Sequence, residues 1–128
     1  MKISKFLSKY ARDLTEVIVA AYRSVIESEG ETQVKVYIWE DGEIETLEQP
    51  CGSNSGFVPA DGRHYVCTIS EPFFNVWDAA GVTPPDDEES EEFDREWEAA
   101  VDWLVEEYKR SCADEVIDDA IKQASYYE

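Results

Sequence analysis

The sequence predicts one α+β domain over residues 1–128: an N-terminal helix, a three-stranded antiparallel β-meander, and a C-terminal acidic helix followed by a second helix. The length favours one domain, because 128 residues are enough for one hydrophobic core and too few for two. The composition favours folding, since 43% of the residues are hydrophobic and 12% are aromatic. The apolar residues recur at helical spacing near both ends of the chain and alternate in between, which predicts the α+β class.

The first predicted helix runs from Ser4 to about Glu29. Its apolar residues are three and four positions apart, so they share one face; they are Phe6, Leu7, Tyr10, Leu14, Val17, Ile18, Ala21 and Val25. The opposite face carries a basic stripe, which faces solvent or a partner and consists of Lys2, Lys5, Lys9, Arg12 and Arg23. Gly30 is expected to end the helix.

Three strands are expected in the middle of the chain. Residues 33–39 alternate between apolar and other side chains, as a strand with one buried face does. The following Asp41 and Gly42 suit a two-residue hairpin turn, so the chain returns as a second strand over 43–48. Residues 63–69 are rich in β-forming types and are expected to complete the meander as a third antiparallel strand.

Two segments connect these elements. Residues 49–61 are rich in Gly, Ser, Asn and Pro and predict a loop. Residues 71–81 are too apolar for a free linker and are expected to pack over the sheet as a short helix or an ordered loop; the residues concerned are Pro72, Phe73, Phe74, Val76 and Trp77.

A further helix is expected to begin between Pro85 and Ser90, where acidic residues complement the positive end of the helix dipole. Its apolar face contains Phe93, Trp97, Ala100, Val101, Leu104, Val105, Tyr108 and Cys112. The later apolar set is centred about 160° away and contains Val116, Ile117, Ala120, Ile121, Ala124 and Tyr127. Either the helix breaks near residues 111–114, with Ser111 capping a new helix, or one long helix serves a second surface and implies a homodimer. We favour the break.

The charge is large and unevenly distributed. The net charge is −19; residues 1–85 contribute −6, residues 86–128 contribute −13, and residues 86–98 alone hold nine acids and one base. Such a field repels nucleic acids and anionic lipid surfaces, so we expect neither nucleic acid nor membrane as a direct partner and a basic protein surface instead. A uniform coat that only maintains solubility is the simpler alternative, but clustering argues against it.

Nothing in the sequence indicates an enzyme, and we expect no metal and no cofactor. The alternation of side chains along a strand places the single histidine, His64, and Cys67 on opposite faces, which is poor geometry for a nucleophile pair. Pairing of His64 with Cys51 requires a contact across the loop. A zinc site from these three residues and Cys112 lacks the short Cys-x₂₋₄-Cys spacing of such sites. Cys67 and Cys112 are expected to be core residues. Three widely spaced cysteines are typical of reduced thiols in a cytoplasmic protein.

The acidic helical face is therefore the candidate binding site. The residues expected to contact a partner are Glu88, Glu91, Glu92, Asp94, Glu98, Asp102, Trp103 and Glu106. Carboxylates on successive helical turns can occupy a Lys/Arg groove in place of phosphates, while an aromatic residue at the rim supplies affinity. Trp103 lies at the border of the acidic and apolar faces, and we favour a half-buried core role for it over that of an anchor; Trp39 and Trp77 are further candidate anchors. The simpler interpretations are a solvated face, or a face paired with the Lys2–Arg12 stripe of the same or a neighbouring molecule.

This chain is small, acidic and of the α+β class, and it has no catalytic motif. With its acidic helix from Asp86 to Glu106 it resembles the phage-encoded inhibitors of bacterial defence, the anti-CRISPR and anti-restriction DNA mimics. The resemblance implies a cytoplasmic protein, in the host bacterial cell, that blocks a nucleic-acid-binding complex. An immunity protein for a nuclease toxin would present the same kind of surface. A dimeric adaptor that associates through residues 116–127 is the third hypothesis.

Overall fold

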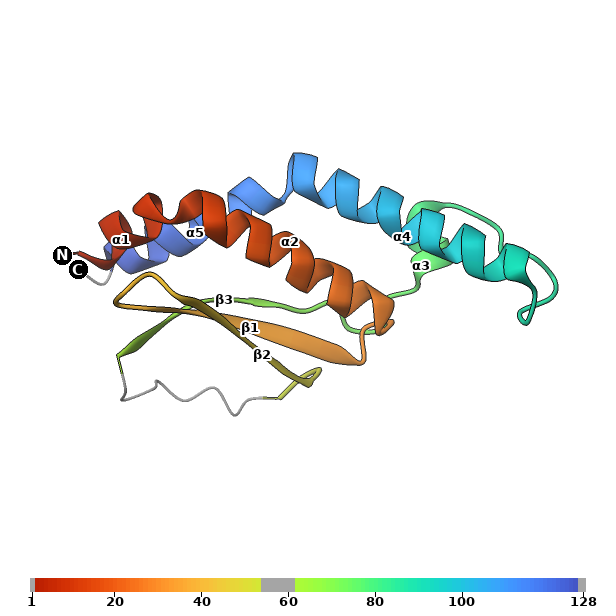
Figure 1. The fold of residues 1–128 in the computed structure, drawn as a ribbon, viewed down its shortest axis with the longest axis horizontal. Coiled ribbons are helices and arrows are strands. Elements are labelled where there is room, and N and C mark those ends of the chain that lie inside the picture. The colour runs from red at the N-terminus through yellow and green to blue at the C-terminus, as the bar shows by residue number, and fades with distance from the viewer. Residues whose placement is uncertain (1, 54–61, 127–128) are drawn as a thin grey trace.

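The computed structural model describes residues 2–53 and 62–126 (Figure 1). In chain order its elements are α1 (Ile3–Lys9), α2 (Ala11–Glu27), β1 (Thr32–Trp39), β2 (Ile44–Pro50), β3 (Arg63–Ile69), α3 (Val76–Ala80), α4 (Glu91–Ser111) and α5 (Ala113–Tyr126). The predicted α+β class is confirmed, with helices at both ends and an antiparallel three-stranded sheet between them.

The helices cover one face of the sheet and enclose the core with it (Figure 1). Val34, Val36 and Ile38 of β1 belong to the same buried cluster as Leu14 and Ile18 of α2. Each aliphatic side chain buried in this way contributes about 1.5–3 kcal/mol to folding. The two layers are therefore held together mainly by the apolar stripe of α2 on the central strand.

The order of the strands differs from the predicted meander. β1 lies between β2 and β3, in the order β2-β1-β3, whereas a meander would place β2 in the centre. Burial explains the difference: residues 33–38 of β1 are all buried, but most of β2 is exposed, so the most apolar strand takes the central place. β2 also extends to Pro50 and so includes the start of the loop predicted over 49–61, of which 54–61 lie outside the described residues.

The N-terminal helix is interrupted once, where a continuous helix was predicted. α1 ends at Lys9, and Tyr10, with φ −103° and ψ 15°, joins it to α2. The change of direction lets α1 pack against α5, while the Tyr10 ring lies close to the hairpin turn at Gly42. Gly30 follows the end of α2 as predicted, with φ +81° and its N–H donating to the Val25 carbonyl at 3.3 Å.

The predicted break between the two C-terminal helices is confirmed. α4 ends at Ser111, and Cys112, with φ −122° and ψ −33°, separates it from α5. Ser111 was expected to cap α5, but it does not. Its hydroxyl donates to the Glu107 carbonyl within α4 at 2.6 Å, because the residue still lies in the last turn of that helix. The offset apolar residues of α5 pack on the core of their own chain, namely Val116, Ile117, Ala120, Ile121 and Ala124. Tyr127 lies outside the described residues.

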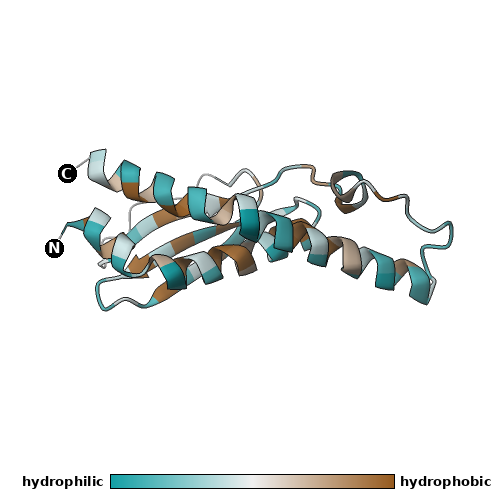
Figure 2. Ribbon diagram, turned by 90° about the horizontal axis from the view of Figure 1, so that it is seen from above, coloured by the Kyte–Doolittle hydropathy of each residue, from teal (hydrophilic) through white to brown (hydrophobic). Residues whose placement is uncertain are grey.

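The N-terminal half of α4 extends beyond the sheet (Figure 1). α3 lies beside it (Figure 2), and the Trp77 and Phe93 rings meet with centroids 5.1 Å apart. The short helix expected within residues 71–81 is confirmed, and its Asn75 cap accepts from the Asp78 N–H at 3.1 Å. The expected packing over the sheet is wrong, because α3 packs on α4, where the Trp77 ring meets Phe93. We call the N-terminal half of α4, residues 91–101, together with α3, the arm.

Candidate functional site

The predicted site residues all lie at the surface, and seven of the eight lie on α4. Ser90 caps the helix by accepting from the Phe93 N–H at 3.1 Å, so α4 begins at Glu91. Glu88 was predicted on the helix but lies in the turn before it, because this cap ends the non-helical segment two residues later. The acidic surface therefore consists of a helical part and a preceding turn.

The carboxylates of α4 form a row along one side of the helix. Its members follow each other at intervals of three or four residues: Glu91, Asp94, Glu98, Asp102 and Glu106. At 1.5 Å per residue the row is about 22 Å long. Glu92 lies about 100° around the helix from Glu91, so it broadens the row at the tip.

One member of the row is already paired within the protein. Asp102 accepts a hydrogen bond from the Arg23 guanidinium at 2.7 Å, and Arg23 also contacts Glu27 at 2.7 Å. The hydrogen bond to Asp102 is the largest cause of the raised pKa of Arg23. Within residues 2–53 and 62–126, the side chains of Glu88, Glu92 and Glu98 make no hydrogen bond or ion pair, and the same holds for the side chains of Glu91, Asp94 and Glu106. Asp102 therefore joins α4 to α2, and the other acids face solvent.

A small hollow lies between α2 and the arm. It has a volume of about 320 Å³ and is lined by Arg23, Glu27, Asp94, Trp97 and Glu98. Two carboxylates of the row thus border a recess with an indole wall, whereas the rest of the row is convex.

The three tryptophans named as anchors have different surroundings. Trp103 is 51% exposed on α4 and is not among the residues packed on the core cluster, so the favoured core role is wrong. Trp77 packs against Phe93 and holds α3 on the arm, and Trp39 lies under the Arg63 guanidinium at 5.6 Å. Of the three, Trp103 is the one open to a partner.

Phe73 is a surface residue that the sequence pattern did not predict. This side chain is 98% exposed, and its backbone has φ +60°. An apolar segment predicts burial, and its neighbour Phe74 does pack against the core, so composition could not separate the two. The Pro72-Phe73 pair was the available signal, since Pro often precedes the positive-φ position of a turn.

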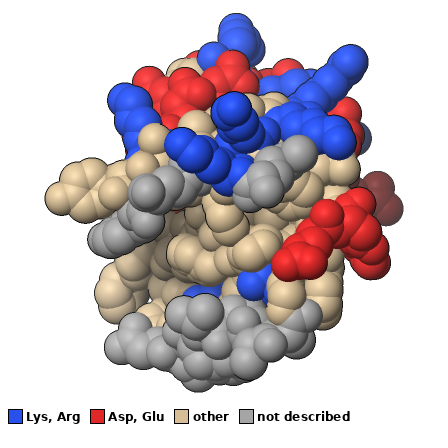
Figure 3. Space-filling model, turned by 90° about the vertical axis from the view of Figure 1, so that its left-hand side faces the viewer, with Lys and Arg blue, Asp and Glu red and all other residues tan. Residues whose placement is uncertain are grey.

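Four of the five residues of the basic stripe lie at the opposite end of the molecule from the arm. Lys2, Lys5, Lys9 and Arg12 are exposed, and Figure 3 shows Lys and Arg gathered on the helical layer at the end that carries α1. These four residues therefore do not pair with the acidic row of their own chain, whereas Arg23, the fifth member of the stripe, pairs with Asp102 of that row.

The cysteines and His64 do not form a reactive group. Burial raises the pKa of the Cys67 thiol to about 12, as for an inert core cysteine. The Cys51 sulfur lies 3.2 Å from the Ser70 hydroxyl. Cys112 was expected in the core but is exposed, because it lies at the break between α4 and α5. Among the described residues no three His, Cys, Asp or Glu side chains are arranged to hold a metal ion.

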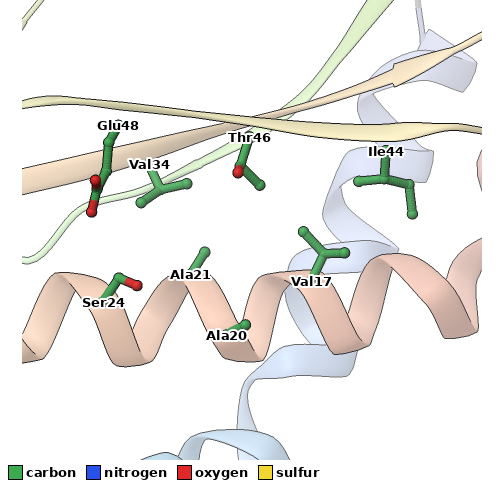
Figure 4. A pocket seen from close by; sticks show the side chains of 8 residues that line it. All are labelled: Val17, Ala20, Ala21, Ser24, Val34, Ile44, Thr46 and Glu48. Atoms are coloured by element: carbon green, nitrogen blue, oxygen red, sulfur yellow. The ribbon is translucent and has the colours of Figure 1, made fainter.

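Two larger grooves lie elsewhere on the described part of the molecule. Figure 4 shows a groove of about 500 Å³ between α2 and the β1–β2 hairpin, into which small and aliphatic side chains point. Its one ionisable residue is Glu48. A second groove of about 620 Å³ separates β3 from α5 and is mostly apolar. The second groove does gather His64, Cys67 and Asp119, because a β-bulge in the β1–β3 pairing places His64 and Cys67 on the same face of the sheet, opposite Ile38 and Val36, and not on opposite faces as was expected. In the described residues no hydrogen bond or ion pair joins these three side chains, so the groove holds no assembled nucleophile and base.

No family model, curated protein or solved structure matches this chain. In the described part of the chain, no helix combines the length and the apolar character needed to cross a bilayer.

Proposed function

We propose that this chain is a non-enzymatic acidic inhibitor that binds the basic nucleic-acid-binding surface of a bacterial defence effector, of the CRISPR or restriction type, in place of nucleic acid. The observation that supports this most strongly is the row of solvent-facing carboxylates on α4, whose N-terminal half projects from the sheet. The proposed place of action is the cytoplasm of the host bacterial cell.

The physical argument rests on spacing and rigidity. Carboxylates three or four residues apart on a helix are about 4.5–6 Å apart along its axis. Phosphates on one DNA strand follow each other at about 3.4 Å of axis, so the two spacings are of the same order. A groove of Lys and Arg side chains then meets several carboxylates at once. Because the arm is held by the Trp77–Phe93 contact and by Arg23, little order has to be gained on binding.

The test is a pull-down from host lysate with the tagged protein at about 0.15 M and about 0.5 M salt, followed by competition with DNA or RNA. We expect capture of a nucleic-acid-binding complex, weaker at the higher salt and displaced by nucleic acid. Capture of a nuclease toxin instead would assign the same face to toxin immunity. Recovery of only a second copy of this chain, or of a partner that nucleic acid does not displace, contradicts the proposal.

A charge-matched pair of variants tests the surface itself. The first carries Glu91→Lys, Glu92→Lys and Glu98→Lys on the arm. The control carries Glu16→Lys, Glu43→Lys and Asp118→Lys, which are exposed and lie outside α4, so both variants change the net charge equally. We expect the first to lose the partner and the control to keep it, with both folded by circular dichroism. Equal loss in both would show that only the total charge matters.

A further inference from the structure

Phe73 lies in the turn between β3 and α3, and its ring is 98% exposed. In the described residues it makes no ring–ring or cation–ring contact and is not part of the core cluster, whereas Phe74 next to it packs on that cluster. A fully exposed phenylalanine gives folding no burial of its ring. Its role must be sought outside the core.

The backbone at Phe73 is also unfavourable. Its φ of +60° lies in the left-handed region, which side chains other than Gly, Asn and Asp rarely adopt. Pro72 followed by a residue of positive φ is the pattern of a type II turn, whose second central position is ordinarily Gly or Asn. The chain therefore places a phenylalanine where a smaller residue would suit the fold better.

The turn that carries Phe73 is rigidly supported. A Cβ added at Gly30 would come within 2.3 Å of the Glu71 carbonyl oxygen and within 2.7 Å of the Phe73 backbone nitrogen. The backbone of the α2–β1 corner thus lies directly against the turn, and the Asn75 cap fixes the start of α3 on the other side. The ring is held outward before any partner arrives.

Exposed carboxylates lie on the two segments that meet at this turn. Glu29 and Glu31 flank Gly30, and Glu71 lies two positions before Phe73. All three are exposed and without an ion pair in the described part of the chain. An exposed aromatic ring among unpaired acids complements an apolar pocket with a basic rim.

We propose that Phe73 is the aromatic anchor of the interface, and that it enters an apolar pocket on a basic protein partner. The inference rests on the proposed function in one respect, that this partner is the one that the acidic row of α4 recognises. In such interfaces a buried aromatic residue slows dissociation, while peripheral charges mainly accelerate association.

Thermal unfolding of Phe73→Asn separates an interface role from a folding role. Asn tolerates positive φ, so we expect the melting temperature of the variant to equal or exceed that of the natural chain. A clearly lower melting temperature would show that Phe73 stabilises the fold, and would overturn the proposal.

Photo-cross-linking in host cells tests contact directly. p-Benzoylphenylalanine replaces Phe73 in one variant and Leu47, which is 39% exposed on β2, in the control. We expect a discrete cross-linked product from position 73 alone, with the attachment point in an apolar pocket of a basic protein. No product above the control overturns the proposal, and so does attachment to an acidic surface.

Binding kinetics with the cross-linked partner, once purified, distinguish the two proposals. We expect Phe73→Ala to increase the dissociation rate constant by at least about tenfold without changing the salt dependence of association. The triple Lys variant of the arm should instead lower the association rate constant. If only Phe73→Ala weakens binding, the anchor stands and the proposed function of α4 fails; if only the Lys variant does, the anchor fails and the proposed function stands.

Discussion

Gly30 shows how one residue can fix two segments that are distant in sequence. It has φ +81°, and its missing side chain leaves room for the backbone of residues 71–74. Any Cβ would displace main-chain atoms rather than a flexible side chain, so the neighbouring turn would have to move. The position of Phe73 therefore depends on this glycine.

Gly30→Ala should lower the free energy of unfolding by about 2–4 kcal/mol, because backbone strain and a steric clash add. Gly81→Ala is the matched control: φ is +70° there, but no atom lies within 4 Å of the added Cβ, so only the strain of about 1 kcal/mol remains. Urea denaturation measures both. An equal loss of unfolding free energy in both variants would show that the turn at residues 71–74 moves away from the Cβ added in Gly30→Ala at no cost in stability.

Alkaline pH should destabilise the protein through three buried groups. Desolvation is the largest cause of the raised pKa of Tyr22, Tyr108 and Cys67, the last from 9.0 to about 12. A raised pKa in the folded state means that the unfolded chain loses the proton first. The stability is therefore complete below about pH 9 and falls as the pH rises towards 12.

The measurement is the melting temperature at intervals from pH 7 to about pH 11, with Tyr108→Phe as the comparison. The variant keeps a ring for the stack with Tyr22, whose centroid lies 3.8 Å away, but has no proton to lose. Its melting temperature should fall less above about pH 9 than that of the natural chain. Parallel curves would mean that Tyr108 does not contribute.

At the scale of elements, the sequence predicted those features that show in the spacing of apolar residues. The helices at both ends and the break at Cys112 follow from a change in the buried face, which apolar spacing reports directly. The central position of β1 was not predictable from pairing rules, because a 12-residue connection between β2 and β3 allows either edge. The Arg23–Asp102 pair joins residues 79 positions apart, and local patterns carry no information on it.

The N-terminal cap of α4 should be the most valuable local contact of the arm. Ser90→Ala removes the acceptor for the Phe93 N–H and should cost about 1 kcal/mol of unfolding free energy. Arg23→Ala breaks a solvent-exposed pair and should cost at most about 1 kcal/mol. Chemical denaturation gives both values; a larger loss for Arg23→Ala would mean that α2, rather than the cap, holds the arm.

For the whole molecule, the net charge of −19 opposes compaction, because acids repel each other more than the few bases attract them. Raising NaCl from about 0.01 M to about 0.5 M shortens the reach of this repulsion and should raise the melting temperature. The triple Lys variant of the arm carries less negative charge and should respond less. A melting temperature independent of salt would show that the folded state already tolerates its charge.

The acidic residues of the candidate site could be predicted from the sequence, but the exposure of Phe73, the proposed anchor, could not. Charge and helical spacing placed the row on one face, since exposed residues need no tertiary information. Phe73 could be recognised only from its φ and exposure, which are properties of the folded chain.

The acidic face of α4 is separate from the core, and this separation has an evolutionary consequence. Substitutions at exposed positions without partners usually change folding stability by less than about 0.5 kcal/mol. Glu91, Glu92 and Glu98 are such positions, whereas Val101 and Leu104 on the other side of the helix are buried. If these acids contact a target as proposed, lineages of this chain can exchange them at little cost in stability as the target diverges, while the inner side of the same helix keeps its sequence.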